Sequence, residues 1–494
     1  MTAFILRAAR YPWFQIALSC LLVILIQVST GPKFFDDAYI TFRYARNLSL
    51  GYGFVYNPSQ QVLGATTPLY TLLLAVSAWL AGPHQIPTAA FILTIIFDSL
   101  NIWLLFRLSS HLFKDTVIAL SIAFAFLLHP LRLDVAAGGM ETSLFIFCLL
   151  AMYDCYLLGS RSWQTGLWAG LAFLIRPDAV LAIAPVFIDW FFRDRKKSIQ
   201  AAAILIAIVL PWTLWAATYF GSPIPQSIIA KGASSHTLPA QALYFLLTFF
   251  ATGTVGPYPH LPIFLFGLPV IACLIYLVWK ALIPAYPSVW VIVAYPFLYL
   301  IVMAAINPPL HFAWYYPPLM PGLLIIFLGA FSILLKFSPS QKRWVIASAG
   351  LLLLGISTLW MTLYPNWPLD RARELAFWDA CAAIQIQVRS GEVVLAPDIG
   401  ILGWCLDRAR IFDSVGLISP EAALYDQTIS QRMLSEVNPA YIIALDQFID
   451  PALRDRPWFT AAFTQLWAQP VTITGITQNL HIFGRTAAGT SLQP

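Results

Sequence analysis

Two adjacent carboxylates, Asp36 and Asp37, follow the first apolar run of the chain and open a segment rich in aromatic and polar side chains, which continues through Tyr39 and Arg43 to Tyr56. Ionisable groups at membrane depth are costly and usually functional, so paired acids at this place predict a chemical role. A carboxylate can take a proton from a hydroxyl nucleophile, or it can ligate a hard divalent cation, which prefers oxygen ligands. Both roles are open for Asp36.

A second set of polar residues accompanies later apolar runs. Glu141 follows two glycines at the start of one run, and the triplet Arg176-Pro177-Asp178 interrupts another. Two short spans that meet at such a break are an arrangement that lines cavities in membranes. Lys231 adds a cation to a connecting segment that prolines stiffen. Together these groups predict a cavity that binds an anion and performs acid–base chemistry.

Each of these residues also has a purely structural interpretation. The acid pair could form an acidic surface loop, and Glu141 could stabilise the N-terminus of its helix. Tyrosines and tryptophans near helix ends commonly belong to the interfacial belt of a membrane protein. The aromatic residues beside Asp36 and Asp37 favour burial of the pair over a solvated loop.

The composition places these residues in a membrane protein. Of the 494 residues, 59% are hydrophobic and 10% are charged, whereas a soluble domain carries about 25% charged residues. The sequence therefore predicts a polytopic α-helical membrane protein. Its apolar runs fall at residues 13–30, 89–107, 116–129, 141–158, 164–175, 178–192, 199–217, 261–280, 286–305, 315–335 and 344–362.

The distribution of lysine and arginine predicts the orientation. With a cytoplasmic N-terminus, most basic residues fall in cytoplasmic loops, which gives about eleven spans and an extracytoplasmic C-terminus in the cell membrane. We expect the run 13–30 to be a retained transmembrane helix rather than a cleaved signal peptide. The first outer loop then covers residues 31–88 and contains an interfacial helix at 68–81.

The tail differs from the rest of the chain. From about residue 366 charges become dense, a helical stretch covers 370–388, and apolar runs shrink to strand length at 393–396 and 441–445. This predicts a membrane-embedded catalytic domain over 1–365 and an extracytoplasmic soluble α/β domain over 366–494, whose charges form a solvated surface. Two cysteines of this tail, Cys381 and Cys405, could pair in an oxidising compartment.

Several motifs together resemble a known family. The segment from Asp36 to Pro58 resembles the first outer loop of GT-C fold membrane glycosyltransferases, in particular the cell-wall arabinofuranosyltransferases and their bacterial relatives. Gly139-Met140-Glu141-Thr142, Arg176-Pro177-Asp178, the segment 221–231 and the segment 314–319 also look like that subgroup. So do the tail segments 398–403 and 413–421. This sequence departs from the subgroup at Gln226 and near Leu63-Gly64.

The resemblance implies an enzyme that moves a sugar from a polyprenyl-phosphate carrier to a glycan, lipid or protein acceptor on the outer face, with inversion at the anomeric carbon. Its partners would be that donor, the acceptor and membrane lipids, with no nucleic acid. A divalent cation is a possible cofactor, held by Asp36. The candidate residues are Asp36, Asp37 and Glu141 for catalysis, Arg43, Arg176, Lys231, His311 and Tyr315 for the donor phosphate, and Tyr39, Tyr56, Asp178 and Trp314 for the sugar and acceptor cavity.

Two other functions fit parts of the pattern. A transporter or flippase of lipid-linked sugars would share the polytopic shell, but it predicts titratable groups near the middle of the membrane and related halves. Here the charges collect at one face, and no internal repeat is visible. A catalytically silent protein that binds lipid-linked sugars would also share the motifs, although it would not need both acids.

Overall fold

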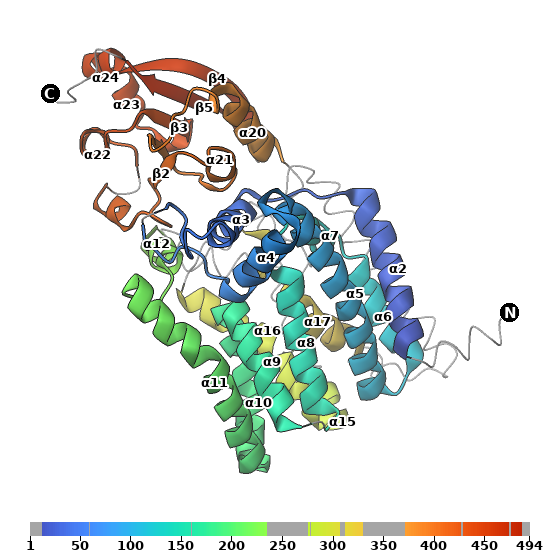
Figure 1. Ribbon diagram of the computed structural model, residues 1–494. Coiled ribbons are helices and arrows are strands. Elements are labelled where there is room, and N and C mark those ends of the chain that lie inside the picture. The colour runs from blue at the N-terminus through green and yellow to red at the C-terminus, as the bar shows by residue number, and fades with distance from the viewer. Residues whose placement is uncertain are drawn as a thin grey trace. The chain divides into compact units, whose positions relative to one another are not determined.

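The computed structural model describes residues 12–58, 60–159, 161–234, 275–276, 278–306, 312–329, 371–425, 428–473 and 476–486 (Figure 1). The chain forms two compact units, each built from separate stretches of sequence. The helical unit comprises the described residues within Met1–Lys33, Ala90–Trp212 and His236–Pro368. The mixed unit comprises those within Phe34–Ala89, Thr213–Ser235 and Leu369–Pro494. The predicted boundary at residue 366, which separates a catalytic from an extracytoplasmic domain, stays a prediction.

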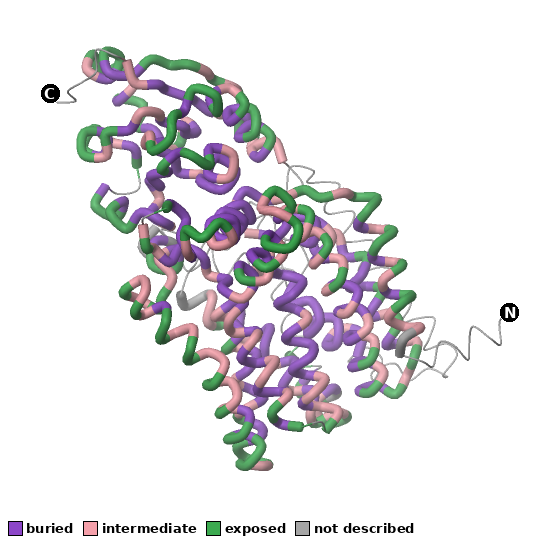
Figure 2. The backbone as a smooth tube through the Cα atoms, viewed as in Figure 1, coloured by how far each residue is buried: buried purple, intermediate pink, exposed green. Residues whose placement is uncertain are grey.

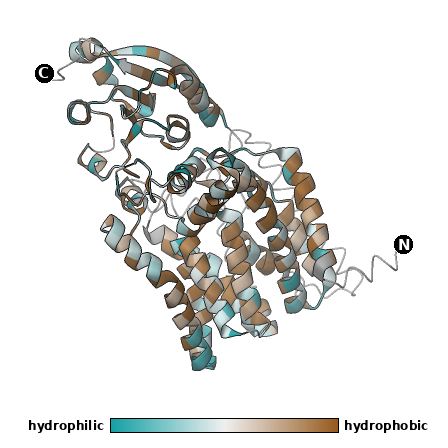
Figure 3. Cartoon of the chain, viewed as in Figure 1, coloured by the Kyte–Doolittle hydropathy of each residue, from teal (hydrophilic) through white to brown (hydrophobic). Residues whose placement is uncertain are grey.

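Apolar helices form most of the helical unit, and they carry predominantly hydrophobic side chains (Figure 3). A helix satisfies its own backbone hydrogen bonds, so it is a form that such sequences can take in lipid. The longer helices in the membrane part of the chain are α2 (Pro12–Thr30), α5 (Ile86–Phe113), α6 (Thr116–Leu127), α7 (Pro130–Ala137), α8 (Thr142–Leu157), α9 (Ser162–Ile175), α10 (Val180–Arg193), α11 (Arg195–Phe220) and α16 (Trp290–Ile306), followed by the short α17 (Met320–Leu324).

The predicted break at Arg176-Pro177-Asp178 is confirmed. Helix α9 ends at Ile175, Arg176 has an extended backbone, and the 3₁₀ turn η2 (Pro177–Ala179) leads into α10. The residue before a proline is pushed out of the helical region, so the sequence itself ends α9 here.

A buried ion pair joins helices of this unit. Arg132 of α7 pairs with Asp98 of α5, and Gln27 of α2 donates a hydrogen bond of 3.1 Å to the same carboxylate. Both charged side chains are almost fully buried. Removal of either partner would leave a buried charge uncompensated, which is strongly destabilising.

By length and composition, two helices within the described ranges can cross a membrane, Pro83–Phe113 and Arg195–Phe220. The number rises to four if each of two bent pairs is one span, namely Thr116–Leu127 with Pro130–Ala137 and Val278–Ala285 with Pro287–Met303. The predicted total of about eleven spans stays a prediction. The run 344–362 and most of the run 261–280 lie outside the described residues.

Three helices of the mixed unit come from the membrane half of the sequence. They are α3 (Asp36–Ser49), α4 (Pro68–Ala81) and α12 (Gln226–Ser234). The bounds of α4 are those that the sequence predicts, because Pro68 suits the first helical turn and Gly82 takes a positive φ of 95° just after the end. The placement of α4 at the membrane interface stays a prediction.

The tail folds around a five-stranded sheet with the order β2-β1-β3-β5-β4. Strand β1 (Val393–Ala396) is parallel to β2 (Arg410–Asp413) and β3 (Tyr441–Leu445). Strand β5 (Ile476–Arg485) is antiparallel to β3 and to β4 (Phe463–Ile473). The predicted strands 393–396 and 441–445 are confirmed, and the predicted helical stretch contains α20 (Ala372–Ile384).

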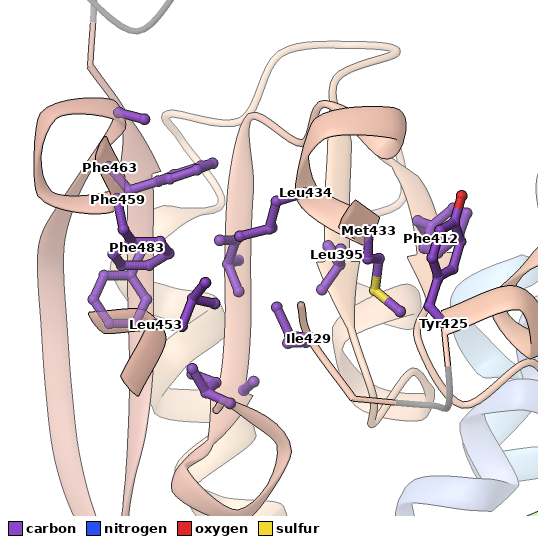
Figure 4. Close-up of a cluster of buried hydrophobic side chains, with 14 of the residues drawn as sticks. Leu395, Phe412, Tyr425, Ile429, Met433, Leu434, Leu453, Phe459, Phe463 and Phe483 are labelled. Atoms are coloured by element: carbon purple, nitrogen blue, oxygen red, sulfur yellow. The ribbon is translucent and has the colours of Figure 1, made fainter. Parts of the chain in front are cut away.

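A hydrophobic core supports this sheet (Figure 4). It packs side chains of β1, β2, β3 and β5 against the helices α22 (Gln431–Val437), α23 (Pro451–Arg454) and α24 (Pro457–Ala462). The strands β1, β2 and β3 consist mostly of buried residues, whereas β4 is largely exposed (Figure 2). The core includes Leu395, Phe412, Met433, Leu434, Leu453, Phe459 and Phe483.

A disulfide joins Cys381 of α20 to Cys405, the last residue of α21 (Gly400–Cys405), with Cα atoms 6.5 Å apart. This separation lies in the usual range for a disulfide. The bond ties α20 to α21.

Candidate active site

The first turn of α3 carries both predicted acids. Asp36 and Asp37 are the first two residues of this helix, and Phe35 before them supplies no side-chain cap. Negative charge in a first turn interacts favourably with the helix dipole. Asp36 is 2% exposed, whereas Asp37 is partly exposed. The pair therefore presents one buried and one more accessible carboxylate.

The carboxylate of Asp36 caps a helix of the tail. It accepts hydrogen bonds from the backbone N–H groups of Gly400 (3.0 Å) and Ile401 (2.7 Å), at the N-terminus of α21. A Cβ at Gly400 would collide with the backbone of Asp36, so only glycine allows this approach. The tail motif 398–403 thus serves to hold the acid of the first loop.

The pKa of Asp36 is raised to about 7, chiefly by burial and then by the nearby carboxylate of Asp398. The guanidinium of Arg373 and the N–H of Ile401 act in the opposite direction. A carboxylic acid whose pKa lies near neutrality is suited to general base catalysis at physiological pH.

Arg373 and Asp398 of the tail interact with the acid pair, and Glu374 lies beside Arg373. Arg373 lies in the first turn of α20, with Nη1 3.5 Å from Oδ1 of Asp398 and Nη2 3.8 Å from Oε1 of Glu374. Burial raises the pKa of Asp398, and the carboxylates of Asp37 and Glu374 add to this, whereas Arg373 lowers it. The mixed unit therefore gathers four carboxylates around one guanidinium.

Arg43, predicted to bind phosphate, is fully buried. Its Nε donates to the carbonyl of Tyr56 at 2.9 Å, Nη1 donates to the carbonyl of Gly403, and Nη2 donates to the carbonyl of Ala409 at 3.0 Å. Nη2 also lies 3.3 Å from the side-chain oxygen of Asn57. These contacts give Arg43 a structural role, in which it joins the first loop to the tail.

The predicted aromatic residues of the first loop have different surroundings. Tyr56 is buried, and its hydroxyl donates to the carbonyl of Ile399 at 2.5 Å. The Tyr39 ring packs edge-on against Trp378 of α20, with ring centroids 5.6 Å apart, and lies 6.0 Å from Trp404 of α21. Tyr56 therefore serves the fold, whereas Tyr39 belongs to an aromatic wall beside the acids.

A second polar group lies in the helical unit. Arg176 pairs with Asp178 through Nε at 3.0 Å and Nη2 at 2.7 Å, and its Nη1 donates to the carbonyl of Trp314 at 3.1 Å. The carboxylate of Glu141 lies 3.9 Å from Nη1. The Tyr315 ring lies 5.2 Å from the guanidinium carbon. The structure thus brings these five predicted residues together within one unit.

The remaining two predicted residues cannot be placed in a site. Lys231 belongs to α12, but its side chain is not among the described ones. His311 lies outside the described residues. Within the described ranges, no three His, Cys, Asp or Glu side chains are arranged to hold a metal ion.

The sequence missed the charged residues of the tail that reach the acid pair. The expectation that the tail's charges form a solvated surface is wrong for Glu374 and Asp398, whose side chains are 10% and 14% exposed. It is also wrong for Asp413, which is fully buried. A signal was present in the glycines of the segment 398–403, since closely spaced glycines allow a close backbone approach.

Comparison with known proteins adds evidence for the fold. The chain is similar to the crystal structure of ArnT from Cupriavidus metallidurans bound to undecaprenyl phosphate, with a TM-score of 0.59, 11% identity, and coverage of 97% of this chain and 98% of that one. The apo structure of the same protein gives a TM-score of 0.53 at 12% identity, with the same coverage. This chain has the GT-C fold. The expected helical membrane fold with a C-terminal sheet domain is therefore confirmed.

Sequence similarity supports the resemblance to the arabinofuranosyltransferase subgroup. A terminal beta-(1→2)-arabinofuranosyltransferase from Mycobacterium tuberculosis is 25% identical over 222 residues, which are 40% of this chain and 35% of that protein. The protein of the same name from Corynebacterium glutamicum is 22% identical over 228 residues, covering 40% and 33%. The match spans about a third of the length of these relatives. A family model described as a domain of unknown function (DUF8728) matches residues 371–486 of this chain, which lie within the tail.

Proposed function

We propose that this chain is an integral membrane glycosyltransferase that transfers a sugar from a polyprenyl-phosphate carrier to a glycan, lipid or protein acceptor. The observation that carries this proposal is the acid pair at the start of α3, with Asp36 buried, in a chain with the GT-C fold. The names of the sequence relatives and the undecaprenyl phosphate bound to ArnT support the donor class.

Asp36 is the proposed general base, with Asp37 supporting it. The acceptor hydroxyl attacks the anomeric carbon while Asp36 takes its proton. The bond from that carbon to the phosphate oxygen breaks, the configuration inverts, and the lipid phosphate leaves with the electron pair. Two oxygens of a carboxylate offer about four lone-pair sites, so the two backbone hydrogen bonds of Asp36 leave capacity to accept a proton.

Arg176 and Lys231 are the proposed contacts of the lipid phosphate. A guanidinium has five N–H donors. The three hydrogen bonds of Arg176, two to Asp178 and one to Trp314, use three of these five donors. Glu141 beside this group is the third candidate acid, Tyr315 is a candidate contact of the donor phosphate, and Trp314 is a candidate ring contact for the sugar. Arg43 and Tyr56 position the loop instead.

The proposed orientation puts the N-terminus in the cytoplasm and residues 366–494 outside it, with about eleven spans between. The distribution of basic residues supports this orientation. The disulfide between Cys381 and Cys405 gives independent support, because such bonds persist in oxidising compartments and are rare in the cytosol.

The test is a transfer assay on the purified full chain with a panel of radiolabelled polyprenyl-phosphate sugars. We expect transfer to an acceptor, or slow hydrolysis of one donor, that depends on Asp36. Binding of a donor without transfer or hydrolysis under any condition would favour the silent binder. Movement of an intact lipid-linked sugar across proteoliposomes would favour the flippase.

A further inference from the structure

The acid centre of the mixed unit draws on two parts of the chain that lie far apart in sequence. Asp36 and Asp37 come from the first turn of α3. The carboxylate of Asp36 is held by Gly400 and Ile401, and Asp398 lies two residues before Gly400 in the turn that connects β1 to α21. The tail therefore contributes both backbone donors and a carboxylate to the same centre.

Carboxylates of this centre come from α3, from α20 and from the turn after β1, and the guanidinium of Arg373 contacts those of the tail. Arg373 lies within 4 Å of Asp398 and Glu374. Like charges at short range repel, so a cation among them stabilises the ionised acids and fixes their spacing. The members are Asp36, Asp37, Glu374 and Asp398 with Arg373.

The backbone around this centre is held in place. The disulfide fixes α20 to α21, and Arg373 lies in the first turn of α20 on the same helix as Cys381. Gly400 packs directly on the backbone of Asp36. Supporting residues on regular elements position a functional group more precisely than a loop alone does.

We propose that Arg373 and Asp398 are positioning residues of the acid centre, so that the tail supplies a necessary part of the active site. Arg373 holds Asp398 through a charge contact. Asp398 in turn sets the place of the α21 N-terminus, whose N–H groups orient Asp36. This inference rests on the proposed function, and it assigns the tail a role in the reaction.

The two contacts of Arg373 indicate which substitution should rescue it. Its two terminal nitrogens lie 3.5 and 3.8 Å from two different carboxylates. Arg373 therefore acts through its charge and does not form a bidentate pair with one acid. Lysine keeps a charge of the same sign, whereas it could not replace arginine at a bidentate site. We therefore expect Arg373→Lys to retain function and Arg373→Gln to lose it.

The experiment measures kcat and donor KM in the transfer assay for Arg373→Gln, Arg373→Lys, Asp398→Asn and the double variant Arg373→Gln/Asp398→Asn. We expect Arg373→Gln to lower kcat by about tenfold or more at an unchanged KM. The lysine variant should recover most of that loss. The kcat of the double variant should be little lower than that of Arg373→Gln alone, because Arg373 is proposed to act through Asp398.

The matched control is the exposed pair Arg432–Glu436 of α22, with 3.0 Å between Nε and Oε1. Arg432→Gln and Arg432→Gln/Glu436→Gln should leave kcat within about twofold of the parent. Unfolding temperatures are recorded for every variant.

Three results would overturn the inference. If the parent is active and Arg373→Gln keeps the parent's kcat, this inference is overturned while the proposed function stands. A fall in kcat that only follows a lower unfolding temperature and that Arg373→Lys does not repair would also overturn it. A parent without transfer to any acceptor would overturn the proposed function and this inference together.

Discussion

The carboxylate of Asp36 and the backbone N–H of Ile401 lie 2.7 Å apart, although 365 positions separate the two residues in sequence. At the other end of α21 the guanidinium of Arg46 donates to the carbonyl of Trp404 at 2.8 Å. An acid at the N-terminus and a cation at the C-terminus both complement the helix dipole. Helix α3 therefore places a negative charge at the N-terminus of α21 and a positive charge at its C-terminus. These contacts make the first loop and the tail parts of one folded structure.

The substitution Asp36→Asn should separate the chemical role of this residue from its role as a cap. Asparagine is as good a cap as aspartate, so the fold should persist, whereas Asp36→Ala should cost about 0.5–2 kcal/mol of stability. Turnover should fall by about 10²–10⁴-fold in both variants, since general base catalysis contributes that much. The measurements are the transfer rate and the unfolding temperature.

The variant Asp37→Asn is the matched control for this assignment. We expect a smaller loss of turnover than for Asp36→Asn, in line with its supporting role. Near-normal transfer by Asp36→Asn, together with loss of transfer by Asp37→Asn, would show that the more exposed acid is the base and that Asp36 only caps α21.

The pH dependence follows from the raised pKa of Asp36, chiefly a result of burial and then of Asp398. The base must be ionised, so kcat/KM should rise with pH and level off above about 7. Stability should change in the opposite direction. Between the ordinary pKa of 3.8 and about 7, the folded state binds a proton that the unfolded state releases, so the stability contributed by Asp36 falls as pH rises.

Unfolding temperatures of the parent and of Asp36→Asn from pH 4 to pH 8 test this sign. The difference, parent minus variant, should decrease as pH rises towards about 7 and stay constant above it. An increase over that range would mean that the folded state favours the ionised carboxylate.

The buried guanidinium of Arg43 should prove structural. Arg43→Lys cannot reach all the carbonyls that the guanidinium bonds, and each buried acceptor left unsatisfied costs about 1–3 kcal/mol. We expect a lower unfolding temperature and faster proteolysis of residues 371–486 in the detergent-solubilised chain. An unchanged unfolding temperature with weaker donor binding would restore the phosphate-binding role that the sequence predicts for Arg43.

Local elements were predictable from the sequence, whereas the contacts between distant segments were not. The helix 68–81 and the strands 393–396 and 441–445 have clear ends in proline, glycine and charged residues, so their bounds agree with the structure. The capping of α21 by Asp36 depends on pairing across most of the chain, which no local pattern encodes. The contacts of Arg373 could not be predicted for the same reason. A charged residue in a polar segment is expected to be solvated unless its partners in the fold are known.

The disulfide between Cys381 and Cys405 should stabilise the tail. It closes a loop over a sequence separation of 24 residues, and chain entropy predicts about 3 kcal/mol for a loop of this size. Cys381→Ser/Cys405→Ser, or the parent in reductant, should unfold at a lower temperature than the oxidised parent. The double variant should no longer respond to reductant. Equal unfolding temperatures with and without reductant in the parent would contradict a disulfide that supports the fold.

The orientation of the chain can be tested with two exposed basic positions. We expect Arg389→Cys, in the tail, to react with a membrane-impermeant maleimide added to intact cells, because the tail is proposed to lie outside the cytoplasm. Lys196→Cys, near the start of α11, should react only after lysis, because basic loops are retained in the cytoplasm. Both substitutions are made in a chain in which the cysteines outside the disulfide, Cys20, Cys148, Cys155 and Cys273, are replaced. Labelling of Lys196→Cys in intact cells, with protection of Arg389→Cys, would reverse the topology and place the acid centre of Asp36 on the cytoplasmic side.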